Sequence, residues 1–293
     1  MATKLLLDTD IGTDIDDAIC LTYLLANPEC DLLGITTVTG EPEKRAMIAS
    51  SLCKHAGLEI PIYPGFAAPL RIKQKQKIAI QSKSLNNWKH ETSFPKGEAI
   101  NFLRKTIREN PGEVVLLTIG PLTNIGSLFS LDPEIPLMLK SIVMMCGYFG
   151  FKFKGKSKLE WNAKGDYHSS EIVFKSNPPI LRSIGLDVTS RVQMTSEEFI
   201  SKFSAEPFRP LRDYAKHWFQ EFTHHITFHD PLAGATVFNK DICKFIKGDI
   251  KIGMKGKRKK GKTFWQGNKN GPHEIAVSVN RQKFFNEYFS VFK

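Results

Sequence analysis

The stretch LLLDTDIGTDIDDA, residues 5–18, decides the fold class of this 293-residue chain. It begins as a short apolar strand, continues as a polar loop and leads into residues 16–26, where apolar residues recur at helical spacing. The loop carries several carboxylates within ten residues: Asp8, Asp10, Asp14, Asp16 and Asp17. Ligands bind at the carboxyl ends of strands in open α/β sheets, so this loop is a candidate site.

The rest of the chain repeats the alternation of strand and helix. Apolar runs predict strands at residues 4–8, 31–38, 60–65, 113–120, 141–147 and 178–188, and helical patterns occur at 43–55, 97–109 and 167–176. Residues 195–238 are predicted to be largely helical, and the lysine-rich residues 66–96 favour a flap or plain surface. We therefore predict an α/β fold: one domain over residues 1–293, with a mostly parallel open sheet and helices on both faces.

Composition narrows the functional class. An apolar fraction of 41% excludes a disordered or fibrous chain. The sequence has no run of about 20 apolar residues, and its N-terminus turns acidic early, so we expect neither a membrane span nor secretion, and a cytoplasmic location. The cysteines have no metal-binding spacing and are expected to be buried free thiols.

The net charge of +11 lies largely in two stretches, 152–158 and 255–262. The stretch 253–262 is typical of a turn between two strands with a basic, solvated tip. An RNA or polyanion patch is the alternative, although aromatic residues that could stack on bases occur only at its end, at Phe264 and Trp265. Binding to nucleic acid is therefore not favoured.

The carboxylates after the first strand require a compensating positive charge. Two carboxylates about 4 Å apart repel by roughly 4 kcal/mol at an effective dielectric of 20. Capping of the following helix by Asp14 and Asp16 accounts for one or two of them, but not for all five. Because Ca²⁺ and Mg²⁺ bind oxygen ligands, the cluster predicts a site for a hard divalent cation.

Several segments, taken in order, resemble the nucleoside hydrolase family, in its inosine-uridine preferring form. They are DTDIG with DDA (8–12 and 16–18), GITTVTG (34–40), IGPLTNIG (119–126) and FHDPLA (228–233), with weaker support from VMMCGY (143–148) and EWN (160–162). Haloacid-dehalogenase-like phosphatases also place DxD after a first strand, but they need Thr or Val where Gly12 stands. The resemblance implies hydrolysis of the N-glycosidic bond of a ribonucleoside to free base and ribose.

The resemblance also implies a role for individual residues. One Ca²⁺ would be held by Asp10, Asp17, Asp230 and the backbone carbonyl of Ile119, with Asp8 orienting these ligands. Asp10 would be the general base and His229 the general acid. The substrate would contact Asp16 through its 2′-hydroxyl, Glu160 and Asn162 through the 5′ and 3′ hydroxyls, and Met145 and Asp230 in the ribose pocket. Asn124 is expected to stabilise its loop, and His224 and His225 to be surface or packing residues of a helix.

Two departures from the family pattern keep other readings open. The family carries Asn after GITTVTG, close to the ribose and the attacking water, and this sequence has Glu41 there. Lysines at 152–158 stand where an Asn contact to the 5′ end is expected, so the substrate could be a modified nucleoside or a nucleoside 5′-monophosphate. A third reading is a catalytically weak relative that binds a metal, a ligand or RNA. The partners expected are a small-molecule ribonucleoside and, by resemblance, further copies of the chain in a homodimer or homotetramer.

Overall fold

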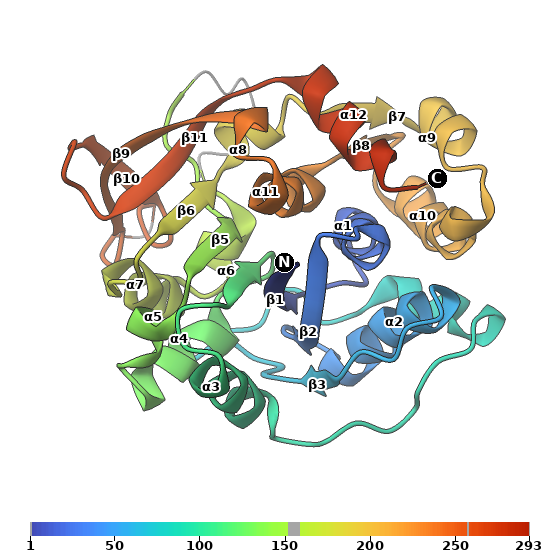
Figure 1. Ribbon diagram of the computed structural model, residues 1–293, viewed down its shortest axis with the longest axis horizontal. Helices are drawn as coiled ribbons and strands as arrows, with labels where there is room; N and C mark the ends of the chain where they lie inside the picture. Colours follow the sequence, from blue (N-terminus) through green and yellow to red (C-terminus); the bar gives the residue numbers. More distant parts are fainter. Residues whose placement is uncertain (1, 152–158, 257, 293) are drawn as a thin grey trace.

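A nine-stranded sheet runs through the molecule (Figure 1). The computed structural model describes residues 2–151, 159–256 and 258–292, so the lysines predicted to face a 5′-phosphate lie outside the described residues. The strands, in spatial order, are β10 (Thr263–Gly267), β9 (Cys243–Ile252), β11 (His273–Val279), β6 (Leu181–Ile184), β5 (Ser141–Met145), β4 (Val115–Thr118), β1 (Thr3–Thr9), β2 (Cys30–Thr37) and β3 (Ile62–Pro64). All pairs from β11 to β3 are parallel, and β9 and β10 add an antiparallel edge. The predicted mostly parallel open sheet is confirmed.

Helices cover both faces of the sheet, because alternate residues of each apolar strand point to opposite sides. Leu5 and Leu7 of β1 pack in one core with α1 (Asp16–Ala26), α2 (Pro42–His55), α11 (His229–Phe238) and α12 (Arg281–Ser290). Leu6 packs in the other core with α3 (Ala99–Glu109), α4 (Thr123–Leu131), α5 (Ile135–Met138) and α7 (Tyr167–Lys175). Figure 1 shows these two groups of helices on opposite sides of the sheet.

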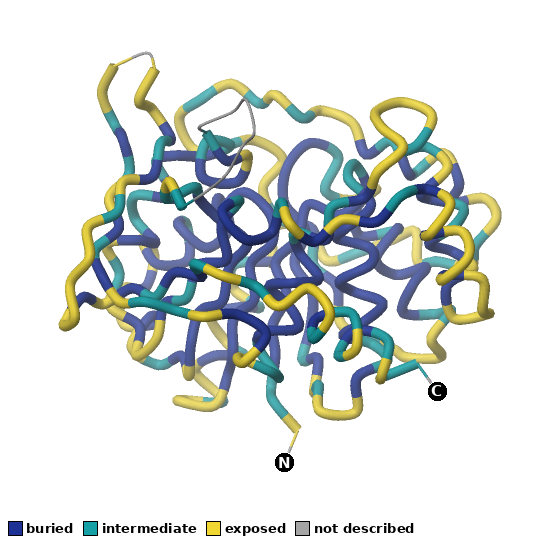
Figure 2. Tube along the Cα trace, turned by 90° about the horizontal axis from the view of Figure 1, so that it is seen from above, coloured by how far each residue is buried: buried dark blue, intermediate teal, exposed yellow. Residues whose placement is uncertain are grey.

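Burial follows this layering. In Figure 2 the buried residues occupy the middle of the molecule, and the exposed ones lie in the outer loops. The cysteines are free, and all except the half-buried Cys30 are buried, in agreement with the sequence. Among the described helices, none is both long enough and apolar enough to cross a membrane.

Residues 195–238 are largely helical, as predicted: they contain α9 (Ser196–Lys202), the short 3₁₀ turn η2 (Glu206–Phe208), α10 (Arg209–Glu221) and α11. The region also contains β8 (His225–Thr227), which pairs with β7 (Gln193–Thr195) in a second, two-stranded antiparallel sheet that was not predicted. His224 and His225 are exposed as expected, but they lie outside a helix.

The predicted strand at 178–188 is shorter than expected, since β6 ends at Ile184 and α8 (Leu186–Thr189) follows. The predicted turn at 253–262 does join two strands, β9 and β10.

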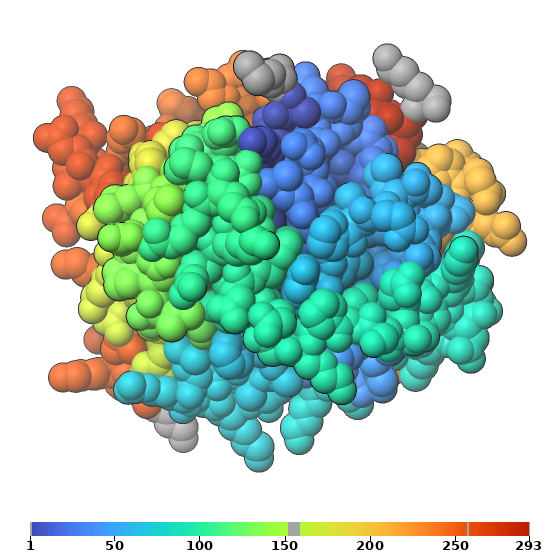
Figure 3. Space-filling model, turned by 60° about the horizontal axis from the view of Figure 1, so that its bottom comes forward, coloured from blue at the N-terminus to red at the C-terminus, as the bar shows by residue number. Residues whose placement is uncertain are grey.

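The lysine-rich stretch 66–96 lies across the surface, and Figure 3 shows it in cyan to teal over one face. It has no regular element until the 3₁₀ helix η1 (Ile80–Asn87), which packs against α2 and α10. Two side-chain contacts fasten η1 to α10, from Ser84 to His217 (2.8 Å) and from Asn87 to Asp213 (3.2 Å). The stretch is therefore an integral part of the surface next to the loop after β1.

Candidate active site

The loops after β1, β4 and β5 meet at the carboxyl edge of the sheet, where a cavity of about 590 Å³ lies. Because these strands are parallel neighbours, residues far apart in sequence reach the same cavity. The predicted site residues that line it are Asp10, Asp16, Asp17, Ile119, Met145, Glu160, Asn162, His229 and Asp230. The structure thus brings together residues from the first loop, the middle of the chain and α11.

The packing of α1 against α11 builds the acidic floor of this cavity. Asp16, Asp17 and Asp230 are buried, and each offers a carboxylate oxygen within 4.8 Å of the others. The Thr9 hydroxyl donates to Asp17 Oδ1 (2.5 Å), and the backbone N–H of Asp230 donates to Asp16 Oδ2 (3.2 Å). These bonds fix the orientation of the carboxylates toward one another.

Burial and mutual repulsion disfavour the charged forms of these groups. Burial raises the pKa of Asp10 to about 6 and that of Asp14, which also lines the cavity, to about 7. Burial, reinforced by the neighbouring carboxylates, raises the pKa of Asp16, Asp17 and Asp230 well above the usual range. Without a cation, these crowded carboxyl groups resist ionisation. A divalent cation bound among them would stabilise their charged forms, so the cluster fits such an ion.

A buried arginine supports the loop after β1, and it was not predicted. Arg45 of α2 is fully buried; its Nε donates to the carbonyl of Gly40 (2.8 Å), and its Nη1 donates to the carbonyls of Asp10 and Ile11. The guanidinium therefore holds the backbone of the loop, and its charge opposes part of the rise in pKa that burial causes at Asp10 and Asp17. A sequence signal exists, because Arg45 shares the apolar helix face of Ile48 and Leu52.

Asp8 and Asn124 lie beneath the site. Asp8 Oδ1 accepts hydrogen bonds from the Thr36 hydroxyl (2.6 Å) and from Asn124 Nδ2 (2.7 Å). Asn124 also donates to the carbonyl of Thr37 (3.1 Å) and accepts from the N–H of Phe66 (3.0 Å). Asn124 thus ties together the loops after β2, β3 and β4, the stabilising role expected from the sequence.

Glu160 and Asn162 form the wall of the cavity at α6 (Trp161–Gly165). Glu160 caps this helix, since its carboxylate accepts from the N–H groups of Asn162 (2.6 Å), Ala163 (2.8 Å) and Gly147 (2.9 Å). Asn162 Nδ2 donates to the carbonyls of Ile119 (2.8 Å) and Met145 (3.0 Å). Asn162 therefore positions the carbonyl of Ile119, the predicted metal ligand, and Glu160 fixes the start of the helix that carries Asn162.

His229 begins α11 and lines the cavity, with Nδ1 2.7 Å from the hydroxyl oxygen of Thr189. Burial lowers the pKa of His229 to about 4. The imidazole is therefore neutral at neutral pH in the free protein, whereas an unperturbed histidine, with a pKa of about 6.5, would be partly protonated.

Glu41 does not join the described residues that line the cavity. Its Oε1 accepts from Lys44 Nζ (2.6 Å) and its Oε2 from the N–H of Ala79 (2.9 Å). These two partners engage both carboxylate oxygens, so Glu41, predicted to bind the substrate, lies outside the described lining of the cavity.

Other lining residues escaped the sequence analysis. Trp218 and Phe222, whose rings are 4.8 Å apart, form an aromatic end of the cavity, and their i, i+4 spacing was the available signal. Gln76 and Lys164 also line the cavity. Gln76 comes from the 66–96 stretch, where no periodic pattern predicts which side chain turns inward.

The chain is similar to several known proteins. Curated relatives include uridine nucleosidase 1 of Arabidopsis thaliana, 27% identical over 86% of this chain and 79% of the relative, and the pyrimidine-specific ribonucleoside hydrolase RihA of Salmonella arizonae, 29% identical over 97% and 96%. Two solved structures share the fold: a plant nucleoside hydrolase and the purine-preferring ribonucleoside hydrolase from Gardnerella vaginalis. Each has a TM-score of 0.84 and 23% identity, and each match covers 99% of this chain. The matches cover 99% of the plant protein and 98% of the Gardnerella protein. The profile of the inosine-uridine preferring nucleoside hydrolases matches residues 5–286, and the chain belongs to that family.

Proposed function

We propose that this cavity hydrolyses the N-glycosidic bond of a ribonucleoside to free base and ribose. The observation that carries the proposal is the convergence of four buried carboxylates, Asp10, Asp16, Asp17 and Asp230, with His229 around one cavity. Cleavage of a glycosidic bond builds positive charge on the sugar, and carboxylates fixed beside it stabilise that charge.

The residues fit a Ca²⁺ ion, which we propose as the cofactor. Asp10, Asp17, Asp230 and the carbonyl of Ile119 would hold it, an all-oxygen set of the kind that Ca²⁺ prefers. When bound, the ion would supply Lewis-acid chemistry that makes a water molecule more acidic. This matters because a carboxylate is a weak base toward free water.

The side chains of the protein divide the remaining work. Asp10 takes the proton of the attacking water as general base, and Asp16 holds the 2′-hydroxyl of the ribose. Met145, Glu160 and Asn162 orient the rest of the sugar. We propose that Nδ1 of His229 accepts the hydrogen bond from the Thr189 hydroxyl, so that the hydrogen of the neutral ring is on Nε2. A hydrogen bond from this N–H stabilises the negative charge that develops on the departing base.

The aromatic end of the cavity suits the base. Trp218 and Phe222 offer ring faces on which a planar heterocycle can stack, and Leu186 adds an apolar contact. Uridine is the first substrate to test, since the curated relatives named above are uridine- and pyrimidine-directed enzymes. Inosine belongs in the same panel.

One described residue favours a second candidate substrate, a nucleoside 5′-monophosphate. Lys164 of α6 lines the cavity a short way along the helix from the Glu160 cap, and its ammonium could pair with a phosphate. A comparison of hydrolysis of uridine with that of its 5′-monophosphate decides between them, and no preference for the phosphate removes this candidate.

The setting of the reaction is part of the proposal. Free cysteines suit a reducing compartment, and we propose the cytoplasm. We also propose that the chain forms a homodimer or homotetramer, which light scattering of the purified protein would test.

The decisive experiment measures release of reducing sugar from uridine and inosine. We expect turnover with Ca²⁺, loss of turnover with a chelator, and recovery when Ca²⁺ is added back. Asp10→Asn should abolish turnover while the protein stays folded, and Asp241→Asn, a change of an exposed carboxylate, should not. Retained turnover in Asp10→Asn would refute its role as base.

A further inference from the structure

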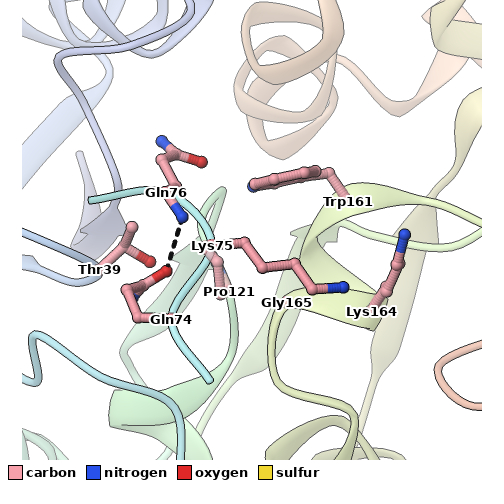
Figure 4. Close-up of a pocket in the computed structure, with 8 residues that line it drawn as sticks. All are labelled: Thr39, Gln74, Lys75, Gln76, Pro121, Trp161, Lys164 and Gly165. Atoms are coloured by element: carbon pink, nitrogen blue, oxygen red, sulfur yellow. Dashed lines mark hydrogen bonds between the residues drawn. The ribbon is translucent and has the colours of Figure 1, made fainter. Parts of the chain in front are cut away.

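Gln76 belongs to the 66–96 stretch, and its side chain reaches Asp10 in the acidic loop after β1. Its Nε2 lies 3.1 Å from Asp10 Oδ2 and 2.8 Å from the hydroxyl oxygen of Thr13. Figure 4 shows the backbone N–H of Gln76 bonded to the Gln74 side chain (2.9 Å), with the Gln76 amide directed away from that bond and the ring of Trp161 across from it. We propose that Gln76 is a positioning residue that fixes the Asp10 carboxylate for proton transfer, an inference that rests on the proposed function.

The Asp10 carboxylate is confined on two sides. A Cβ on Gly120 would lie 3.0 Å from Asp10 Oδ1, so this oxygen packs directly against the turn after β4. The other oxygen, Oδ2, accepts the hydrogen bond from Gln76. Rotation of the carboxylate would break this bond or press an oxygen against Gly120, and the two contacts together select one orientation.

The segment that carries Gln76 is itself held in place. A Cβ on Gly40 would lie 2.5 Å from the carbonyl oxygen of Gln76, so residue 76 rests directly on the glycine before Glu41. Glu41 then accepts from the N–H of Ala79, three residues further along. Glu41 therefore acts on the site from outside the cavity, as an anchor for the segment that presents Gln76.

A second glutamine strengthens the same connection. Gln81 Nε2 donates to the carbonyl of Asp14 (2.8 Å), and the N–H of Gln81 donates to the carbonyl of Gly12 (3.0 Å). Gln81 contacts only the backbone of the acidic loop, whereas Gln76 contacts the carboxylate of Asp10. Gln81 therefore supports the loop, whereas Gln76 orients the proposed base.

The consequence is kinetic. A base must point at the proton that it removes, and misalignment slows the chemical step more than it weakens substrate binding. A hydrogen bond to a charged group contributes enough that its loss should lower kcat about 10- to 100-fold. Because Gln76 acts through Asp10, KM should change by less than about threefold.

The test compares Gln76→Ala, Gln76→Glu and the matched control Lys77→Ala, an exposed neighbour in the same segment. We expect Gln76→Ala to lower kcat for uridine at saturating Ca²⁺, with KM and the urea midpoint of unfolding nearly unchanged. Gln76→Glu should lose at least as much, since it replaces the donor by an anion of the same shape. Lys77→Ala should behave as the wild type does.

A double-mutant cycle tests the anchor. If Glu41 acts through Gln76, Glu41→Ala lowers kcat in the wild type and has little further effect in Gln76→Ala. Additive losses would show that Glu41 acts separately and would remove the anchoring part of the inference.

The outcomes that overturn the inference are distinct. Unchanged kcat in Gln76→Ala, or a rise in KM alone, would show that Gln76 does not position the base. A fall in kcat that parallels a loss of stability, or that disappears at saturating Ca²⁺, would assign Gln76 a merely structural role. A wild-type protein that hydrolyses no ribonucleoside would instead remove the proposed function, and this inference with it.

Discussion

The guanidinium of Arg45 bonds to the backbone of Asp10, not to its carboxylate. A fully buried cation therefore lies under the acidic loop without forming an ion pair with the Asp10 carboxylate. The loop thus keeps a fixed backbone, while its carboxylates remain available to a metal ion and a substrate.

Removal of this cation should destabilise the whole protein. Arg45→Met would leave the carbonyls of Gly40, Asp10 and Ile11 without their donors, which we expect to cost about 2–5 kcal/mol of the free energy of unfolding. Arg45→Lys should recover only part of this, because a single ammonium cannot span the same carbonyls. Urea unfolding measures the change, and Arg104→Met, at a side chain that is 44% exposed, is the control. An Arg45→Met protein as stable as the control would contradict this account.

The pH dependence of stability should reveal the metal site. Burial raises the pKa of Asp10 to about 6 and of Asp14 to about 7, so the metal-free native state binds more protons than the unfolded chain does. Its free energy of unfolding should therefore fall as the pH rises from about 4 to about 7. Ca²⁺ competes with these protons, so the stabilisation that it adds should grow over the same range. Paired urea titrations with chelator and with Ca²⁺ measure the difference, and a difference independent of pH would argue against a metal bound by these groups.

Close packing at Gly120 gives a sharper prediction. A Cβ there would lie 2.8 Å from the backbone nitrogen of Asp10 and 3.0 Å from its Oδ1. Gly120→Ala should therefore displace Asp10, lowering both kcat/KM and Ca²⁺ affinity by about tenfold or more. Gly267→Ala, at a position with no atom within 4 Å, is the control and should be neutral. Normal activity in Gly120→Ala would mean that the position of Asp10 is not critical.

The contact between Thr189 and His229 should set the tautomer of the imidazole. Thr189→Val preserves shape but removes the hydroxyl, so the hydrogen of the neutral ring is no longer directed to Nε2. We expect kcat to fall about tenfold. Thr189→Ser, which retains the hydroxyl, should restore most of the loss; equal activity of the two variants would show that this contact does not matter for turnover.

Local pattern made much of the fold predictable. The strand, loop and helix of residues 5–18 are adjacent in sequence. The continuous apolar strands at 113–120 and 141–147 indicate a sheet that is covered on both faces. The pairing of β7 with β8 was not predicted, because the two strands are only three residues each and their pairing is a tertiary contact.

The site divides in the same way. The loop aspartates lie in one short segment, and Ile119, His229 and Asp230 could be assigned only through resemblance to a family. Arg45 and Gln76 were not predicted: the position of Arg45 on an apolar helix face was the available signal, but arginine is rarely buried, and no periodic pattern marks Gln76. Their positions follow from how α2 and residues 66–96 pack on the first loop.

The bond from Asp230 to Asp16 joins residues separated by 214 positions. A ribosome adding about 5–20 residues per second needs about 10–40 s to make that span. During this interval the aspartates of the first loop have been synthesised, but α11, which carries Asp230, has not. If the proposed Ca²⁺ binds to this cluster, the nascent chain should bind the ion only after α11 has emerged, so that metal binding would belong to the last stage of biogenesis and stabilise a nearly complete fold.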